Sequence, residues 1–138
     1  MRSPAVTVLA EQMWQRLEPM LVAYGDKVTE GAHPLVKDVG HSANEVFPLR
    51  AYLSLMKSPQ GDELAVSVDM HGDDSVLTIE SDISRGDGSL LAEGPSVAFS
   101  LSKSSDELKK VLSQWFQDFD RFLRKSGDEV AAAAALLE

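Results

Sequence analysis

Three stretches near the middle of the chain alternate between apolar residues and residues that are mostly polar. These stretches cover 49–56, 64–71 and 76–83. Successive side chains of a β-strand point to opposite faces of a sheet, so the alternation predicts three half-buried strands. Turn-forming residues separate the stretches at 58–62 and 72–75. The chain is therefore expected to form an antiparallel sheet with one apolar face, which a second layer must cover.

The apolar positions of these strands also predict how the strands pair. A consistent register places inward-facing residues opposite one another in both hairpins. The expected pairs are Leu55–Leu64, Leu53–Val66 and Ala51–Val68 in the first hairpin, and Met70–Leu77, Val68–Ile79 and Leu64–Ile83 in the second. A fourth strand is expected over 89–102, bent at Gly94-Pro95, and Pro95 favours a place at the edge of the sheet.

Amphipathic helices are predicted on both sides of the sheet segment. Ser3 and Pro4 provide an N-cap and a first helical residue, and apolar residues then recur at helical spacing as far as Tyr24. Pro19 predicts a kink or a break, and Gly25 predicts the end of this helix. The second helix begins with the capping pattern Ser104 to Glu107, carries an aromatic stripe and is expected to end at Gly127.

These elements predict an α+β fold with two layers. We expect a four-stranded antiparallel meander with the N- and C-terminal helices packed on one face, in the order α-β-β-β-β-α. Residues 1–127 would form a single domain, and 128–138 a flexible alanine-rich tail whose last two residues, Leu137-Glu138, resemble a cloning scar. Residues 26–48 show no periodicity and predict a long loop, either functional or holding a short helix near 42–47.

The charge of the chain is concentrated in the predicted sheet. The net charge is −9, and residues 58–94 hold nine acidic residues and a single arginine. Such a segment repels phosphate backbones, which argues against nucleic-acid binding, and it attracts basic proteins. The same acids would also serve to keep the sheet soluble without any partner.

The leading functional hypothesis is a non-catalytic module that binds a basic protein through the sheet face not covered by the helices. Small toxin-neutralising proteins and secretion chaperones share the short, acidic, cysteine-free α+β profile. Acidic residues would steer the partner, and one aromatic and one methionine side chain would add apolar contact. The candidate residues are Asp69, Asp73, Asp74, Glu80, Asp82, Tyr52 and Met56. We expect a cytoplasmic protein with no membrane partner, and self-association through the open face or an edge strand is compatible with this hypothesis.

Two other classes of function stay open. A small-molecule or lipid-binding domain would use a pocket between the helices and the sheet, lined by Trp14, Trp115, Phe116, Phe119 and Phe122. An enzyme would centre on residues 26–48 and His41. Asp38, His41 and Glu45 would share a helical face suited to a metal, and the acids and His71 at 69–74 could bind calcium. No nucleotide, zinc-protease or hydrolase motif occurs, so we expect no catalytic residue, metal or cofactor.

Overall fold

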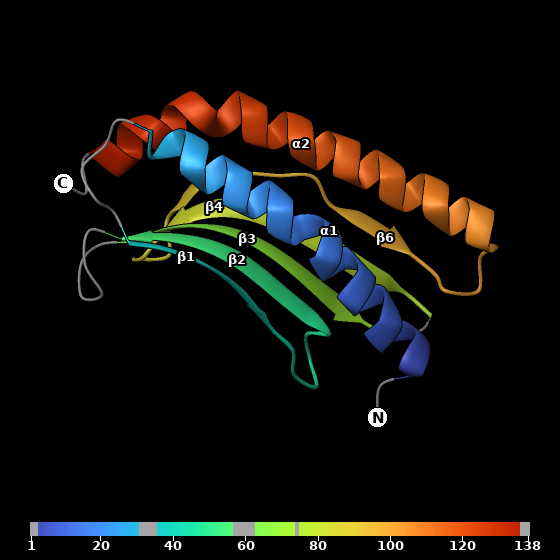
Figure 1. Cartoon of the computed structure of the whole chain (residues 1–138). Coiled ribbons are helices and arrows are strands. Elements are labelled where there is room, and N and C mark those ends of the chain that lie inside the picture. Colours follow the sequence, from blue (N-terminus) through green and yellow to red (C-terminus); the bar gives the residue numbers. More distant parts are fainter. Residues whose placement is uncertain (1–2, 31–35, 57–62, 74, 136–138) are drawn as a thin grey trace.

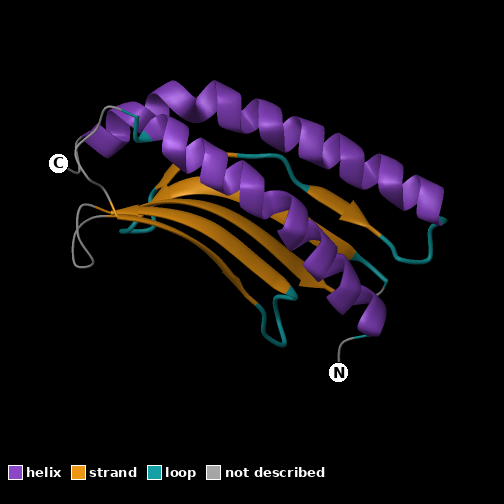
Figure 2. Cartoon of the chain, viewed as in Figure 1, coloured by secondary structure: helices purple, strands orange, loops and turns teal. Residues whose placement is uncertain are grey.

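Two helices and six strands make up the structure, a computed structural model that describes residues 3–30, 36–56, 63–73 and 75–135. Both helices lie on the same side of a single curved sheet (Figures 1 and 2). In chain order the elements are α1 (Pro4–Val28), β1 (Val36–Ser42), β2 (Leu49–Met56), β3 (Glu63–Gly72), β4 (Leu77–Arg85), β5 (Leu90–Glu93), β6 (Val97–Phe99) and α2 (Ser105–Ala135).

The predicted α+β class is confirmed, with terminal helices packed on an antiparallel sheet, but the number of strands is larger than four. The strand order is β1-β2-β3-β4-β5, and β6 also pairs with β4. One additional strand, β1, lies in 26–48, which was predicted to be a loop or to hold a short helix, and the other arises because the strand predicted over 89–102 is divided into β5 and β6. All strand pairs are antiparallel.

The predicted register is correct in the first hairpin and wrong in the second. Leu55 faces Leu64, and the other two predicted pairs of β2 and β3 also form. In the second hairpin Met70 faces Ile79 and Gly72 faces Leu77, a shift of two residues from the prediction. The β3 strand continues to Gly72, and the turn closes where the Asp73 N–H donates to the Val76 carbonyl at 3.1 Å. A shift of two leaves every side chain on its predicted face.

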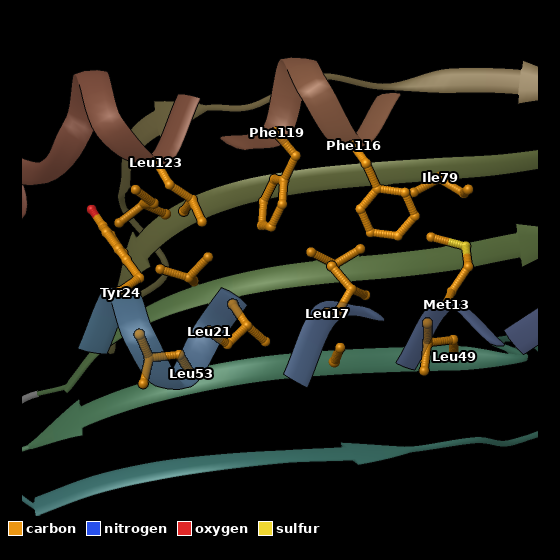
Figure 3. Packing of buried hydrophobic residues seen from close by; sticks show 14 of the residues in the cluster. Met13, Leu17, Leu21, Tyr24, Leu49, Leu53, Ile79, Phe116, Phe119 and Leu123 are labelled. Atoms are coloured by element: carbon orange, nitrogen blue, oxygen red, sulfur yellow. The ribbon is translucent and has the colours of Figure 1, made fainter. Parts of the chain in front are cut away.

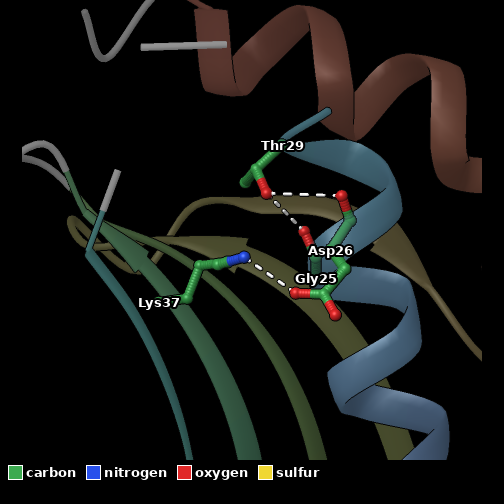
Figure 4. A network of polar contacts seen from close by, with 4 residues as sticks. All are labelled: Gly25, Asp26, Thr29 and Lys37. Atoms are coloured by element: carbon green, nitrogen blue, oxygen red, sulfur yellow. Dashed lines mark hydrogen bonds and ion pairs between the residues drawn. The ribbon is translucent and has the colours of Figure 1, made fainter. Parts of the chain in front are cut away.

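Strand β1 occupies part of the segment predicted to be a loop or a short helix. It forms the edge of the sheet beside β2, with His41 opposite Ala51. An ion pair connects β1 to the end of α1: Lys37 Nζ lies 2.8 Å from Asp26 Oδ1 (Figure 4). The Thr29 hydroxyl donates to the Gly25 carbonyl at 2.8 Å and caps the same helix end. The segment therefore forms an edge strand held against the helical layer.

The last predicted strand is divided into β5 and β6 around Gly94-Pro95. The Pro95 carbonyl accepts hydrogen bonds from the Ser81 hydroxyl at 2.8 Å and from Trp115 Nε1 at 3.1 Å. A side chain at Gly94 would overlap Ser81 and the Phe122 ring. The predicted bend therefore connects the sheet to α2, because the Pro95 carbonyl is hydrogen-bonded to both.

The helix ends predicted at glycines are wrong in both helices. The first helix continues past Gly25 to Val28, and Pro19 lies inside it without breaking it into two elements. Gly25 brings α1 close to β2, because a Cβ there would lie 3.0 Å from the Leu53 side chain. The second helix passes through Gly127 to Ala135, so residues 128–135 continue the helix, and Val130 and Ala133 are buried. Residues 136–138, with the supposed scar, lie outside the described chain, as does the predicted turn at 58–62.

The core fills the space between the helices and the sheet (Figure 3). Met13, Leu17 and Leu21 of α1 face the apolar residues of β2 to β4, and Phe116, Phe119 and Leu123 approach from α2. The Phe119 ring stacks on the Trp115 ring, with the two ring centres 4.9 Å apart. Burial of these side chains holds one face of the sheet against the helices and leaves the other face uncovered within the described chain.

Candidate functional site: the open face of the sheet

The open face consists of the strand residues that point away from the helices. On β2 and β4 these are the even-numbered residues of 50–56 and 78–84, and on β3 they are the odd-numbered residues of 63–71. The residues between them are buried on the side of the helices. The register adds the even-numbered residues 36–42 of β1 and, from β5, Glu93 and the exposed Leu90. The face therefore spans the full width of the path from β1 to β5.

Acidic side chains dominate this face. Arg50 is its only lysine or arginine among the described strand residues, whereas six acids lie on it: Asp38, Glu63, Asp69, Glu80, Asp82 and Glu93. Two pairs of like charge are direct cross-strand neighbours, namely Asp69 with Glu80 and Asp82 with Glu93. Like charges in such positions destabilise a sheet. The geometry therefore concentrates negative potential over β3, β4 and β5.

Asp82 lies in the middle of this cluster. Partial burial raises the pKa of Asp82 above its ordinary value, and the carboxylates of Asp69, Glu80 and Glu93 raise this pKa further. Each of these causes disfavours the charged form of Asp82. A cation placed over the cluster would favour the ionised carboxylate and relieve the repulsion.

Part of the negative charge is already paired within the protein. Arg50 Nε lies 3.3 Å from Asp69 Oδ1, and the Arg50 guanidinium also lies over the Phe47 ring, 4.4 Å from its centre. His71 Nε2 lies 3.5 Å from Glu80 Oε1, a contact that neutralises charge only when the imidazole is protonated. Four open-face acids form no ion pair within the described chain: Asp38, Glu63, Asp82 and Glu93. Of these four, only Asp82 and Glu93 are cross-strand neighbours. The unpaired charge is therefore greatest on the β4–β5 side of the face.

The two predicted apolar contact residues lie on the β1–β2 side. The Tyr52 ring lies across Gly40 of β1, where a larger side chain would overlap the ring, and its hydroxyl is 3.5 Å from Asp38 Oδ2. Met56 is half-buried at the end of β2, opposite Glu63. Both residues are thus on the open face, but they lie on different strands from the unpaired acids.

The predicted site residues at the β3–β4 turn do not join this cluster. Asp73 Oδ1 accepts hydrogen bonds from the N–H groups of Ser75 at 2.9 Å and Val76 at 3.2 Å. This carboxylate therefore shapes the turn, as aspartate commonly does. Asp74 lies outside the described residues.

Three acids of the open face were missing from the predicted site. Glu63 lies next to a predicted turn, and carrying the alternation of 64–71 outward by one residue would have identified it. Glu93 lies inside the predicted strand 89–102, where the irregular register of β5 departs from a simple alternation. Asp38 could not be found in this way, because β1 shows no periodic pattern in the sequence. The negative face is therefore wider than the predicted set.

The residues proposed for an enzyme or metal site are dispersed. Asp38 lies on the open face, whereas the His41 ring stacks on Trp14 of α1 with the ring centres 4.1 Å apart. The helical face expected for Asp38, His41 and Glu45 does not exist, because the first two lie in a strand and Glu45 follows it. No cluster of three or more potential metal ligands occurs within the described ranges. His33 lies outside them.

The aromatic residues predicted for a helix–sheet pocket are part of the core. Trp115, Phe116 and Phe119 are buried, and Trp14 and Phe122 pack against them. Single rings of this set line separate pockets within the described chain: Trp115 lines one of about 360 Å³ between β6 and α2, and Phe116 lines one of about 160 Å³ between the two helices.

Comparison with known proteins gives no relationship from which a function could be transferred: no family model, curated protein or solved structure matches the chain. Neither described helix combines the length and apolar character that a membrane crossing requires.

Proposed function

We propose that this protein is a non-catalytic binding module whose open face recognises a basic protein. The observation that supports the proposal is the placement of six acids and one arginine on the uncovered face of a sheet. Sequestering a basic toxin and holding a basic chain before its export are two processes that such a module serves.

The cost of the acidic cluster supports a binding role. Asp82 and its three acidic neighbours repel one another in the free protein. A surface that needs only solubility gains more from acids dispersed among bases. A lysine or arginine of a partner would lie over β4 and β5, close to Asp82 and Glu93, where no basic side chain of the described chain competes for them.

The same charge restricts the class of partner. Nucleic acids are disfavoured because their phosphates meet a negative face. A symmetric dimer through the open face is also disfavoured, because the acids of both copies would lie against each other. The basic partner would gain both a higher association rate and the rim ion pairs that fix its orientation.

The test compares two triple variants with the same net charge in an affinity capture from extract of the source organism. The open-face variant carries Glu80→Lys, Asp82→Lys and Glu93→Lys, which leaves the Arg50–Asp69 pair in place. The control carries Glu11→Lys, Glu18→Lys and Asp128→Lys, three exposed positions on the helices. Circular dichroism establishes that both variants are folded.

We expect wild type and control to capture the same basic protein at low salt, and the open-face variant to lose it. Moderate salt should weaken the capture by wild type, since exposed charges are screened. Equal capture by both triple variants, or no basic protein captured by wild type, would overturn the proposal. In either case the acids on the open face would serve solubility only.

A further inference from the structure

A groove of about 410 Å³ lies between the two helices, away from the open face. It runs along α1 from Pro19 to Val28 and along α2 from Asp120 to Gly127. Nine residue steps of helix correspond to about 14 Å at 1.5 Å per residue. Met20, Val28 and Leu123 contribute apolar walls. The volume lies within the range of small-molecule sites, which are also mostly apolar.

Gly127 lines this groove without a side chain. A Cβ at this position would meet no atom within 4 Å, so the space beside it is empty. Glycine in the interior of a helix is less stable than alanine, yet here no contact in the fold requires it. Because Gly127 is part of the groove wall, we expect a leucine at this position to occupy part of the groove.

The groove also contains a buried polar group without a partner. Tyr24 is 7% exposed, and its hydroxyl forms no hydrogen bond within the described structure. Figure 3 shows this hydroxyl directed toward α2. Burial, and to a lesser extent Glu129, raises the pKa of Tyr24 to about 12, so the group remains a donor at neutral pH. Buried hydroxyls nearly always have a partner, which makes this one a candidate for contact with a ligand.

The charged residues that line the groove, Lys27, Asp120 and Arg124, carry one excess positive charge, and Glu129 lies near Tyr24 outside this lining. Lys27 is exposed and forms no ion pair within the described chain. Arg124 Nε lies 3.0 Å from Asp120 Oδ2, which neutralises that pair. Lys27 is therefore free to attract an anion, and Tyr24 precedes it by three residues, about one turn of α1.

We propose that this groove binds an amphipathic carboxylate with a flexible apolar chain, of about the size of decanoate. The chain lies along Met20 and Leu123, and the carboxylate lies beside Lys27. It accepts a hydrogen bond from the Tyr24 hydroxyl after a small movement of the ring exposes that atom. This site is independent of the open face and does not rest on the proposed protein-binding function.

The test titrates the whole protein with decanoate and, separately, with the uncharged decanol, followed by calorimetry and by backbone amide NMR shifts. Gly127→Leu occupies part of the groove, Tyr24→Phe removes the donor, and Lys27→Gln removes the cation. Lys125→Gln is the matched control, an exposed lysine of α2 outside the groove. Thermal melting establishes that each variant is folded.

Decanoate should bind more tightly than decanol and shift the amides around the groove. Gly127→Leu should abolish binding without lowering the melting temperature. Tyr24→Phe should weaken binding about tenfold, as expected for a hydrogen bond to a charged group, and yet leave the free protein as stable or more stable. Lys27→Gln should weaken it about threefold, and Lys125→Gln should leave it unchanged.

Three results would overturn this inference. The first is that decanoate shifts no amide at the groove, and the second is that decanol binds as tightly as decanoate. The third is that Tyr24→Phe and Lys27→Gln both bind decanoate as tightly as wild type does. The two conservative variants keep the proposal testable even if Gly127→Leu does not fold.

Discussion

Replacing Asp82 with asparagine should stabilise the protein at neutral pH. The carboxylate of Asp82 is directly opposite Glu93 and also lies near Glu80 and Asp69. The substitution removes the charge and keeps the size and shape of the side chain. If the acidic cluster is under electrostatic strain, the neutral variant loses that strain without losing a packing contact.

The expected gain is modest because Asp82 is only partly buried. A like-charged cross-strand pair costs about 0.2–1 kcal/mol. With one directly opposite acid and two further carboxylates, we expect the free energy of unfolding to rise by about 0.5–1 kcal/mol at low salt. For a chain of this length that corresponds to about 2–4 °C in melting temperature.

The pH dependence distinguishes this cause from a packing effect. The pKa of Asp82 is raised in the folded protein, so ionisation of Asp82 costs stability above its folded pKa. The cost disappears as the pH falls through the folded pKa to the ordinary value of 3.8. The advantage of the variant should therefore be full near pH 7 and absent at about pH 3.8 and below, and added salt should reduce it.

Urea unfolding of wild type and Asp82→Asn at both pH values measures this difference. Asp128→Asn, an exposed acid on α2, is the control and should change stability little at either pH. The reasoning is refuted if Asp82→Asn is no more stable than wild type at pH 7, or if its gain in stability is equally large at the ordinary pKa of 3.8.

Three further substitutions test the fold by chemical unfolding. Phe119→Ala should cost about 3–5 kcal/mol, because it leaves a cavity beside the stacked Trp115 ring; a loss below about 1 kcal/mol would contradict that packing. Gly94→Ala should cost about 1–3 kcal/mol, since its Cβ would overlap Ser81, and a neutral result would mean that this link yields easily. Ser104→Ala should cost about 1 kcal/mol, because the Ser104 hydroxyl accepts the Glu107 N–H at 3.3 Å; an unchanged midpoint would argue against a capping role.

The sequence predicts the sheet best where strands are half-buried. The fully buried apolar residues of the β2–β3 hairpin lie on one side, and the register predicted from that pattern is the observed one. In the β3–β4 hairpin the pattern allows shifts of two residues, since each keeps the same face inward. The choice between them depends on the turn, where Gly72 adopts a φ of +117° and Asp73 closes the loop.

Edge strands and helix ends were hard to predict because tertiary contacts determine them. β1 has no buried residue, so it carries no alternation, and its position follows from pairing with β2 and from contacts with α1. Gly25 and Gly127 resemble helix stops, but both lie inside helices. At Gly25 the close approach of Leu53 explains the glycine better than a helix end does.

The candidate binding face was predictable in outline only. Asp69, Glu80 and Asp82 were placed on it correctly by the strand period, which depends on residue spacing alone. The predicted β2–β3 register already places Arg50 opposite Asp69, whereas the like-charged pairs Asp69–Glu80 and Asp82–Glu93 depend on registers of β4 that were not predicted. The helix–helix groove joins residues about 100 positions apart in the sequence, and no local pattern indicates it.

The most direct test of the binding face is carbodiimide labelling of carboxylates in the free protein and in its complex with the captured basic partner. Mass spectrometry then measures the labelling of each acid. We expect the partner to protect Glu80, Asp82 and Glu93 while Glu11 and Glu18 on the helical side stay labelled. Equal labelling of the open-face acids in both states, or protection confined to the helical side, would contradict the proposal that the open face binds the partner.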